Sequence, residues 1–457
     1  MVGSVDAATR KKVLKVVFIS LLLDLISFTF ILPLFPKLLE FYRNSEAPTD
    51  PAAPPKDTLL SWILSQLNAY KAAFARPIDS RYDIVLLGGA LGSLFSLLQA
   101  VASPIIGTLS DRYGRRTALL ASMMGNILSV LLWVMAVDFR TFLLSRVVGG
   151  LSEGNVQLAT AIATDISDSS SRGSTMALIG ACFSIAFTFG PALGAWLSSI
   201  ATVAANPFAT AAGFSLFLIV TETVYLYTSL PETLPSMSED TNGHATKEEK
   251  SNGKPDEQKP IQRTNSHFVL NATHFAFLLF FSGMEFSLPF MTYDLFGYSS
   301  AKNGRLLGFV GLVASILQGG VTRRLPPLLS VKTGVVACLL AFVLLGRLTS
   351  VPMLYLAATF LATTSATVVT GLNALASFEA NEGERGGKLG VMRSWGQVGR
   401  GLGPILFTSV YWWAGREVAY AIGAAGIAGV AAIVFGGLSS PPGSEKRAKP
   451  VKSGKKE

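Results

Sequence analysis

Charged residues are scarce in this chain of 457 residues: they make up 15% of it, whereas hydrophobic residues make up 50%. A soluble domain has about a quarter charged residues, so the composition excludes an ordinary soluble protein. The hydrophobic residues are grouped in runs of about 20, and each run is long enough to cross the hydrocarbon core of a bilayer as a helix. Because the runs are continuous rather than alternating, we predict an all-α protein that crosses a membrane many times.

Cysteine and histidine are almost absent. The two cysteines, Cys182 and Cys338, both lie in apolar runs, where a cysteine is more often a packing residue than half of a disulfide. The three histidines lack metal-ligand partners, and the sequence has no glycine-rich nucleotide-binding loop. We therefore predict no cofactor, no metal site, no enzyme activity and no ATP-driven step.

Twelve membrane-spanning helices are predicted from the apolar runs and the polar segments between them. If the N-terminus is cytosolic, most of the 38 Lys and Arg residues lie in cytosolic segments, as the positive-inside rule requires, and the C-terminus is cytosolic too. This bias also accounts for the net charge of +9, so we predict no nucleic-acid partner. The helices are expected near residues 14–36, 83–106, 117–137, 141–163, 175–199, 207–230, 268–291, 303–321, 331–349, 352–376, 389–413 and 417–438.

Two long polar segments interrupt this pattern. The outer loop 37–81 begins with a Pro-, Ala- and charge-rich stretch that is expected to be mobile. Its second part, 59–74, has apolar residues at helical spacing, which predicts either an amphipathic helix on the outer surface or an ordinary packed loop helix. The other segment is nearly free of large apolar residues and is predicted to be a disordered cytosolic linker. The predicted parts are an N-terminal half, this linker, a C-terminal half and a basic tail: 1–235, 236–265, 266–440 and 441–457.

An internal repeat supports two related halves. An Arg-Gly dipeptide begins at Arg172 and again at Arg385, and a Gly-Pro dipeptide follows each at the same distance, at Gly190 and Gly403. The two sets fall in the fifth and eleventh predicted helices, which are six helices apart. We therefore predict two pseudo-symmetric bundles of six helices each.

Polar stripes run along the fourth and eleventh predicted helices. An ionisable residue in hydrocarbon costs at least ~2.5–3.5 kcal/mol, so such residues usually face a partner or a watery cavity. Stripes from opposite halves are predicted to line a central aqueous cavity; the alternative is that they only lock helices together. Arg393, near the cytosolic end, is expected to snorkel towards the surface. The stripe residues are Arg146, Gly150, Glu153, Gln157 and Thr160 in one helix, and Arg393, Gln397 and Arg400 in the other.

Three acids also lie at membrane depth: Asp24, Glu222 and Glu285. A low-dielectric environment disfavours a charged carboxylate, so such a group is suited to gaining and losing a proton. We predict proton-coupling roles for the three; the alternative is that each is the structural partner of an arginine, for example Asp24 of Arg146. The predicted apolar contacts of a substrate are Phe28, Phe286 and Trp395.

A cationic turn containing one acid, Gly107–Arg116, lies between the second and third helices. Asp111 can accept hydrogen bonds from the N-terminus of a neighbouring helix, whereas the arginines can pair with acids or lipid phosphates. Glycines and prolines in the fifth and eleventh helices allow close approach and bending. The second-half counterpart, 319–326, lacks the acid, so we expect a one-sided gate. The predicted gating residues are Gly107, Asp111, Arg112, Gly114, Arg115, Arg116, Gly190, Pro191, Gly194, Gly403 and Pro404.

These motifs resemble the major facilitator superfamily, and within it the tetracycline-antiporter-like branch of drug:proton antiporters. The turn Gly107–Arg116 matches the family's signature between helices 2 and 3, and the segments around Asp24, Arg146 and Gly190 resemble further signatures. The resemblance implies transport of organic anions coupled to a counter-ion, with Arg146 in proton transfer. One departure is Ala195, where the helix 5 antiporter pattern usually has a glycine.

The expected function is secondary active transport of amphipathic organic anions, with Arg146 and Arg400 attracting the anion. The transporter is expected to be a monomer in the plasma membrane or an intracellular membrane, with a small-molecule substrate and protons or a counter-ion as partners. One alternative is an exporter of cationic drugs that uses Asp24, Glu153 and Glu285 as substrate acids. Another is a membrane scaffold that transports nothing.

Overall fold

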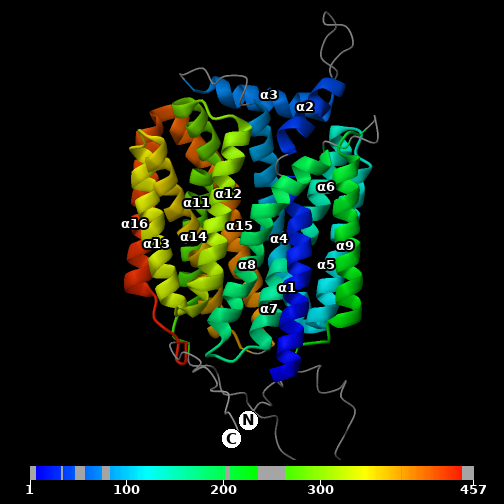
Figure 1. Ribbon diagram of the computed structural model, residues 1–457, viewed down its shortest axis with the longest axis vertical. Helices are drawn as coiled ribbons and strands as arrows, with labels where there is room; N and C mark the ends of the chain where they lie inside the picture. The colour runs from blue at the N-terminus through cyan, green and yellow to red at the C-terminus, as the bar shows by residue number, and fades with distance from the viewer. Residues whose placement is uncertain are drawn as a thin grey trace, which may run out of the picture.

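The computed structural model describes residues 7–31, 34–46, 57–74, 83–198, 200, 206–234, 263–381 and 383–444. Within these ranges the chain forms helices and no strand, so the predicted all-α class is confirmed. Most of the predicted linker 236–265 and most of the tail 441–457 lie outside the described residues. The long helices run side by side in one bundle, and two short helices, α2 and α3, lie across one end of it (Figure 1).

Each predicted span overlaps one helix or two consecutive helices. In the N-terminal half the helices are α1 (Ala7–Thr29), α2 (Phe35–Ser45), α3 (Leu59–Ala72), α4 (Asp83–Tyr113), α5 (Arg115–Val134), α6 (Phe139–Ser152), α7 (Asn155–Asp165), α8 (Arg172–Ser198) and α9 (Ala209–Ser229). In the C-terminal half they are α11 (His267–Phe296), α12 (Ser300–Gly320), η2 (Thr322–Arg324), α13 (Pro327–Gly346), α14 (Val351–Phe378), α15 (Arg385–Ala414) and α16 (Arg416–Gly437). We call the end where α1 begins and α16 ends the terminal end (Figure 1).

Among the described residues, nine helices are long and apolar enough to cross a membrane. The three remaining predicted spans correspond to α1, α15 and the α6–α7 pair. Charged residues within α1 and α15 lower their apolar character, and α6 and α7 are each too short to cross alone. These are also the helices that carry most of the predicted substrate-binding and proton-coupling residues, because charges in hydrocarbon are tolerated where they face one another or water.

The fifth and eleventh predicted helices pack in equivalent ways. A Cβ atom at Gly190 of α8 would lie 1.8 Å from Thr29 Oγ1 of α1. A Cβ atom at Gly403 of α15 would lie 2.2 Å from Ser282 Oγ of α11. Only glycine permits both approaches, so the matching dipeptides of the sequence mark matching helix contacts in the two halves.

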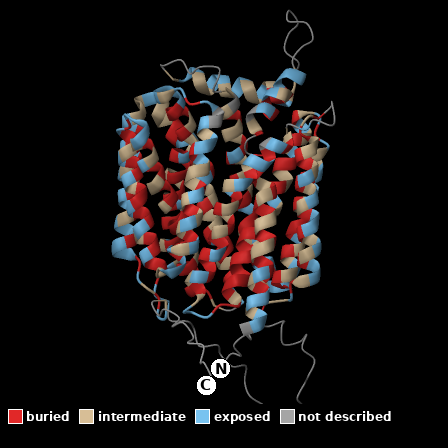
Figure 2. Ribbon diagram, viewed as in Figure 1, coloured by how far each residue is buried: buried red, intermediate tan, exposed pale blue. Residues whose placement is uncertain are grey.

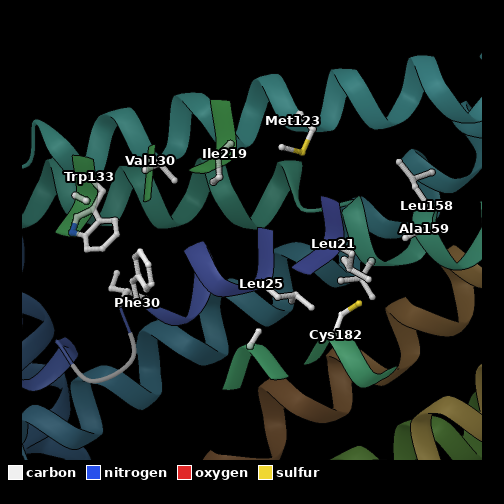
Figure 3. Packing of buried hydrophobic residues seen from close by; sticks show 14 of the residues in the cluster. Leu21, Leu25, Phe30, Met123, Val130, Trp133, Leu158, Ala159, Cys182 and Ile219 are labelled. Carbon is white, nitrogen blue, oxygen red and sulfur yellow. The ribbon is translucent and has the colours of Figure 1, made fainter. Parts of the chain in front are cut away.

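Each half has its own hydrophobic core. One large cluster is built almost entirely from residues of α1 to α9, and the other from residues of α11 to α16. Figure 3 shows the first of them, in which Cys182 packs near Leu21. Cys182 and Cys338 are both buried and free, as predicted. The separate cores support two packing units joined along an interface.

The outside of the bundle is apolar. Buried residues concentrate inside it and exposed residues outside (Figure 2). Many of the exposed side chains are large and hydrophobic, including Trp413 at 74% and Ile316 at 65% exposure. A soluble protein rarely leaves such side chains in water over a continuous surface, whereas a bilayer solvates them.

The described parts of the loop 37–81, residues 37–46 and 57–74, are helical for most of their length. The first predicted span ends at Thr29, and α2 follows as a separate helix whose Leu38, Leu39 and Tyr42 are buried in the N-terminal core. The predicted mobile stretch therefore contains a packed helix, because apolar residues at helical spacing also occur there. The predicted helix at 59–74 is confirmed as α3, which Thr58 caps by accepting a hydrogen bond from Ser61 N at 3.2 Å.

Helix α3 touches both halves at the end opposite the terminal end (Figure 1). Its Leu60 is buried in the N-terminal core. Near its other end, Tyr70 Oη lies 2.7 Å from Ser409 Oγ of α15. The Tyr70 and Phe74 rings lie 6.4 and 6.2 Å from the Trp412 ring, in edge-to-face geometry. The predicted amphipathic helix is thus a bridge between the halves.

We expect Trp412→Ala to loosen α3. Two ring pairs are worth ~0.5–1.5 kcal/mol each, so their loss should raise the opened population of α3 by roughly tenfold. Hydrogen–deuterium exchange of residues 59–72 measures this. Trp413→Ala is the matched control, because that side chain is 74% exposed on the outer surface. Equal exchange in the two variants would show that the Trp412 contacts do not hold α3.

Candidate functional site

Three acids from separate elements form one group inside the N-terminal half. Asp24 comes from α1, Glu153 from the junction of α6 and α7, and Glu222 from α9. Asp24 interacts electrostatically with Glu153, and Glu222 interacts with both. Asp24 and Glu222 are only 3% and 1% exposed. Asn126 of α5 donates a hydrogen bond of 3.4 Å to Glu153 Oε2. Carboxylates that interact with one another disfavour the ionisation of all three at once, so the group is suited to holding protons.

One cation that interacts with this acidic group comes from the other half, and Arg146 of the same half interacts with Glu153. Arg393 of α15 interacts electrostatically with Glu153 and Asp24. It also donates a hydrogen bond of 3.3 Å from Nη2 to Gln99 Oε1 of α4. The expected snorkelling of Arg393 towards the surface is therefore wrong, because its guanidinium is hydrogen-bonded to the buried Gln99 side chain of α4. The acidic group of one half and Arg393 of the other therefore interact across the interface.

Arg146 of α6 is held by aromatic rings rather than by Asp24. Its guanidinium lies 5.5 Å from the Phe142 ring centre and 5.9 Å from that of Trp133. Among the described residues Asp24 and Arg146 form no ion pair, so the alternative of a purely structural pair is not observed. Both side chains line a cavity of about 40 Å³ that Phe28 and Glu153 also line. This volume accommodates water but not an amphipathic anion.

The predicted stripe on the fourth helix is interrupted. α6 ends at Ser152 and α7 begins at Asn155, with a non-helical Glu153 between them (ψ 85°). The Gly154 amide donates to Ser122 Oγ of α5 at 2.9 Å, so a hydroxyl from another helix holds the break open. Beyond the break Gln157 donates to the Ser103 carbonyl at 2.9 Å.

The interruption separates the residues of the stripe. Gln157 is engaged with α4, and Thr160 Oγ1 donates to the Val156 carbonyl within α7 at 2.7 Å. Neither lines the cavity that Arg146 and Glu153 line. The prediction of one continuous polar face on this helix is therefore wrong, since the break changes the helical phase.

Arg400 and Glu285 face an accessible space inside the bundle. About two and a half turns separate Arg400 from the exposed, outward-facing Val391, so the two side chains point in opposite directions. Its neighbours fix this orientation: Gly399 packs on the Phe275 carbonyl of α11, and Gly401 packs on Leu97 of α4. The Arg400 side chain is nevertheless exposed. A charged side chain that is exposed between two packed helices points into an interior space rather than to lipid.

Glu285 has the same character. It is the only exposed residue in 270–292, all of which are described. It also interacts electrostatically with Arg400. The C-terminal half therefore presents one acid and one base towards the interior, whereas the acids of the N-terminal half are enclosed.

The other predicted contacts are placed less favourably. Phe28 packs against Phe95 with ring centres 5.8 Å apart. Phe286 fills the contact between α11 and α4, where a Cβ atom at Gly89 would lie 2.3 Å from its ring. Trp395 is on a different face of α15 from Arg400 and stacks edge-to-face on Phe268 and Phe275 of α11. The structure therefore does not bring Trp395 next to Arg400. The prediction rested on the aromatic residue type of Trp395 and not on its position around the helix.

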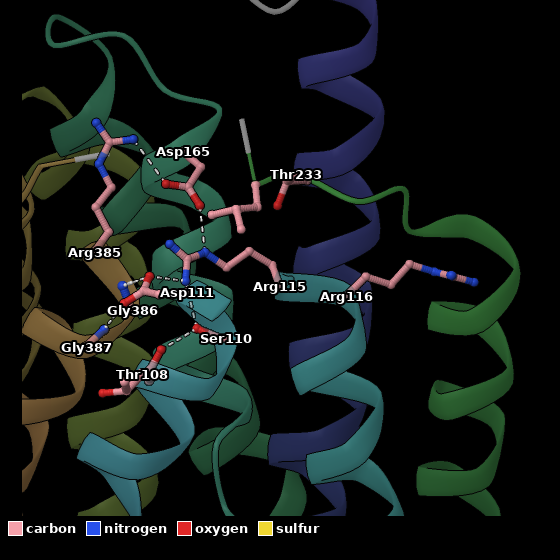
Figure 4. Close-up of polar contacts among 12 residues, drawn as sticks. Thr108, Ser110, Asp111, Arg115, Arg116, Asp165, Thr233, Arg385, Gly386 and Gly387 are labelled. Carbon is pink, nitrogen blue, oxygen red and sulfur yellow. Dashed lines mark hydrogen bonds and ion pairs between the residues drawn. The ribbon is translucent and has the colours of Figure 1, made fainter. Parts of the chain in front are cut away.

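The cationic turn forms a second site at the terminal end. Asp111 accepts hydrogen bonds from the Gly386 and Gly387 amides at 2.9 and 2.6 Å, at the start of α15 (Figure 4). This is the contact with a helix N-terminus that the sequence predicted. Arg115 Nη1 donates to Asp111 Oδ1 at 2.6 Å. A Cβ atom at Gly107 would lie 2.2 Å from the Gly386 carbonyl oxygen, so the helices approach here through glycine.

A buried carboxylate extends this contact. Asp165, at the end of α7, accepts from Arg115 Nε at 2.8 Å and from Arg385 Nη1 at 3.0 Å (Figure 4). The Asp165 and Arg115 side chains have no exposure, and that of Arg385 has 6%. The sequence indicates Arg385 only as part of the internal repeat. It gives no indication of Asp165, because an acid at a helix end is unremarkable in sequence. We call the group the latch: Asp111, Arg115, Asp165, Arg385, Gly386 and Gly387.

The remaining residues of the turn do not cross between halves. Arg112 is exposed and lies over the Tyr113 ring at 5.3 Å. Arg116 Nη2 donates to the Tyr227 carbonyl of α9 at 2.6 Å, within the same half. Gly114 has φ 95°, which lets the chain reverse between α4 and α5. Only part of the predicted gating turn therefore contacts the C-terminal half.

The equivalent arginine of the other half has different contacts. Arg172, the counterpart of Arg385, donates to the Ser377 carbonyl of α14 at 3.2 Å and lies over the Phe378 ring at 4.6 Å. The nearby segment 319–326 contains arginines but no acid. The acid of the cationic turn is therefore not repeated in this second-half segment.

Two helical halves, an apolar exterior and interior charges define a multi-pass integral membrane protein of the transporter type. Residues 17–404 match the Major Facilitator Superfamily, and the chain belongs to that family. It is 35% identical to Major facilitator superfamily domain-containing protein 10 of Mus musculus, over 91% of this chain and 90% of that protein. It is 28% identical to the class G tetracycline resistance protein of Vibrio anguillarum, over 71% of this chain and 80% of that protein.

Solved structures agree with these sequence matches. The human organic anion transporter MFSD10 (TETRAN) superposes with a TM-score of 0.81 and 31% identity, over 93% of this chain and 99% of that chain. A double tryptophan mutant of XylE superposes with a TM-score of 0.69 at 14% identity, which reflects the fold alone. The predicted family is confirmed; it is a family of transporters and not of enzymes.

Proposed function

We propose that the protein is a secondary active transporter of amphipathic organic anions, driven by protons or another ion. The observation that carries this proposal is Arg400, an exposed cation at mid-helix that faces the interior between α4 and α11. A guanidinium in this position attracts a carboxylate or sulfonate group, because a charge-assisted hydrogen bond to an oxyanion is stronger than one between neutral groups. The similarity to a structure described as an organic anion transporter supports the same substrate class.

Alternating access between two six-helix halves is the proposed mechanism. The terminal end is proposed to be cytosolic, with twelve spans in which α1, the α6–α7 pair and α15 complete the nine apolar helices. The latch closes the cytosolic end, and α3 bridges the halves at the outer end. Transport then requires the latch to open, so that the halves rock about the interior charges.

Proton coupling is proposed to act through two groups of acids. In the N-terminal half, protonation of Asp24 or Glu153 weakens the attraction of the acidic group for Arg393 of the other half. In the C-terminal half, Glu285 competes with an anion for Arg400, and its protonation removes that competition. His274 and Arg393 also interact electrostatically with Arg400. Both effects link proton occupancy to substrate binding or to contact between the halves.

A cationic substrate is the second candidate, because three acids lie together in the N-terminal half. The enclosed cavity beside them, at about 40 Å³, is too small for a drug-sized cation in this conformation. A scaffold has no need of an accessible charge inside the bundle. Because such a charge is costly in a membrane, its presence favours a transport function.

Uptake into proteoliposomes tests the proposed substrate class. We expect amphipathic anions to compete for uptake and cations not to compete. Arg400→Ala should lower anion kcat/KM by at least tenfold, since a hydrogen bond to a charged group is worth ~1.5–3 kcal/mol. Arg347→Ala is the control, because Arg347 is exposed at the end of α13. Wild-type uptake by Arg400→Ala, or competition by cations alone, would contradict the proposal.

A further inference from the structure

A groove outside the interior site lies between α1 and α8 at the terminal end. Its volume is about 440 Å³, and none of the interior charges or latch residues lines it. Three basic residues and three apolar residues form its walls: Arg10, Lys11, Leu14, Lys15, Phe18 and Leu178. Neither the transport site nor the latch accounts for this combination.

The groove changes character along α1. Its bases lie at the start of the helix, whereas Phe18 is about two turns further into the bundle. Leu178 of α8, at 39% exposure, adds a second apolar wall. A polar entrance followed by an apolar channel matches a phospholipid, in which a charged headgroup is joined to apolar acyl chains.

The charges at the entrance are arranged to receive an anion. Arg10 is fixed there, because its Nη1 is paired with Asp168 Oδ2 at 2.6 Å and its Nη2 is bonded to Ser171. Lys11 and Lys15 are exposed and lie one turn apart on the same side of α1. Among the described residues neither lysine forms an ion pair. Two ammonium groups therefore remain available beside a fixed guanidinium.

We propose that this groove binds an anionic phospholipid of the cytosolic leaflet, with its phosphate between Lys11 and Lys15 and an acyl chain along Phe18 and Leu178. The assignment of the leaflet rests on the proposed cytosolic terminal end; binding itself does not depend on transport. Basic pockets between helices at this depth are suited to anionic headgroups. The bound lipid holds the start of α1 against α8.

Native mass spectrometry of the full chain, with phosphatidylserine and phosphatidylcholine added separately, tests the site. We expect preferential retention of phosphatidylserine. Lys11→Ala together with Lys15→Ala should lower that retention roughly 25-fold, at about fivefold per lysine. Lys12→Ala removes the same charge from the same helix but does not line the groove, and should have little effect. Leu178→Trp should also lower retention by filling the apolar part without changing the charge.

Three results would overturn the site. Equal retention of the two lipids would exclude selection of an anion. A loss with Lys12→Ala as large as with Lys15→Ala would indicate general surface attraction. Full competition by soluble glycerophosphoserine would indicate a headgroup site without an acyl-chain groove. Arg400→Ala should keep lipid retention while losing anion uptake, so failure of the lipid site and failure of the transport site give different results.

Discussion

Asp165→Asn should open the terminal end and destabilise the closed state by about 3 kcal/mol, the low end of the cost of breaking a buried ion pair, because Arg115 keeps its contact with Asp111. Asp165 is fully buried between Arg115 of its own half and Arg385 of the other half. Without the carboxylate, two guanidinium groups face each other in a low-dielectric contact. Opening separates them and admits water, so the equilibrium should shift by at least a hundredfold towards the open latch.

Solvent accessibility of the latch measures this effect. A cysteine placed at Gly387 should react with a water-soluble maleimide much faster in the Asp165→Asn background. Asp168→Asn is the matched control, since it is the same substitution three residues later, and the pair with Arg10 is exposed and worth at most ~1 kcal/mol. If the two backgrounds gave the same labelling rate, Asp165 would not hold the halves together.

Asp111→Asn should act in the same direction but less strongly. The amide side chain keeps one acceptor oxygen for the α15 amides and loses its charge towards Arg115. We expect faster opening with substrate affinity in a trapped state nearly unchanged, because the interior site is not touched. A large loss of affinity in the trapped state would place the latch in the binding site.

Asp24→Asn should lower uptake driven by a pH gradient by at least tenfold. Anion counterflow measured without a gradient should stay close to wild type. Asparagine fills the same space but cannot bind or release a proton. The acidic group therefore loses the titratable side chain that α1 contributes. The pH dependence of net uptake should flatten with it.

Uptake into the same proteoliposomes at imposed and collapsed pH gradients separates these effects. Asp57→Asn serves as the control, because Asp57 is exposed beside the start of α3. If Asp24→Asn retained full stimulation by the gradient, the coupling proton would be carried elsewhere, and Glu285→Gln would be the next variant to measure.

Local patterns in the sequence were sufficient for most of the helices and for one side of the latch. Apolar runs located the spans, and the charge of Asp111 beside a turn indicated a helix N-terminus as its partner. The break at Glu153 could not be predicted in this way, because Ser122 of another helix holds the Gly154 amide. Asp165 was missed for a similar reason, since its two arginines are far from it in sequence.

Helical phase explains the remaining differences. The stripe on the fourth helix assumed one continuous helix, and the break removed that assumption for Gln157 and Thr160. Trp395 was predicted to contact the substrate as an aromatic residue near Arg400, yet the two residues lie on different faces of α15. Arg393 was expected at the surface because of its depth, but its hydrogen bond to Gln99 of the opposite half lies inside the bundle.

Paired distance measurements by electron–electron resonance test alternating access most directly. One spin-label pair would replace Tyr113 and Glu384 at the terminal end, and the other Arg140 and Glu417 at the opposite end; all four positions are exposed, whereas both native cysteines are buried. We predict that Asp165→Asn lengthens the first distance and shortens the second in the same molecules. Lengthening at the terminal end without shortening at the other, or no change in either, would contradict rocking of the two halves about the interior charges.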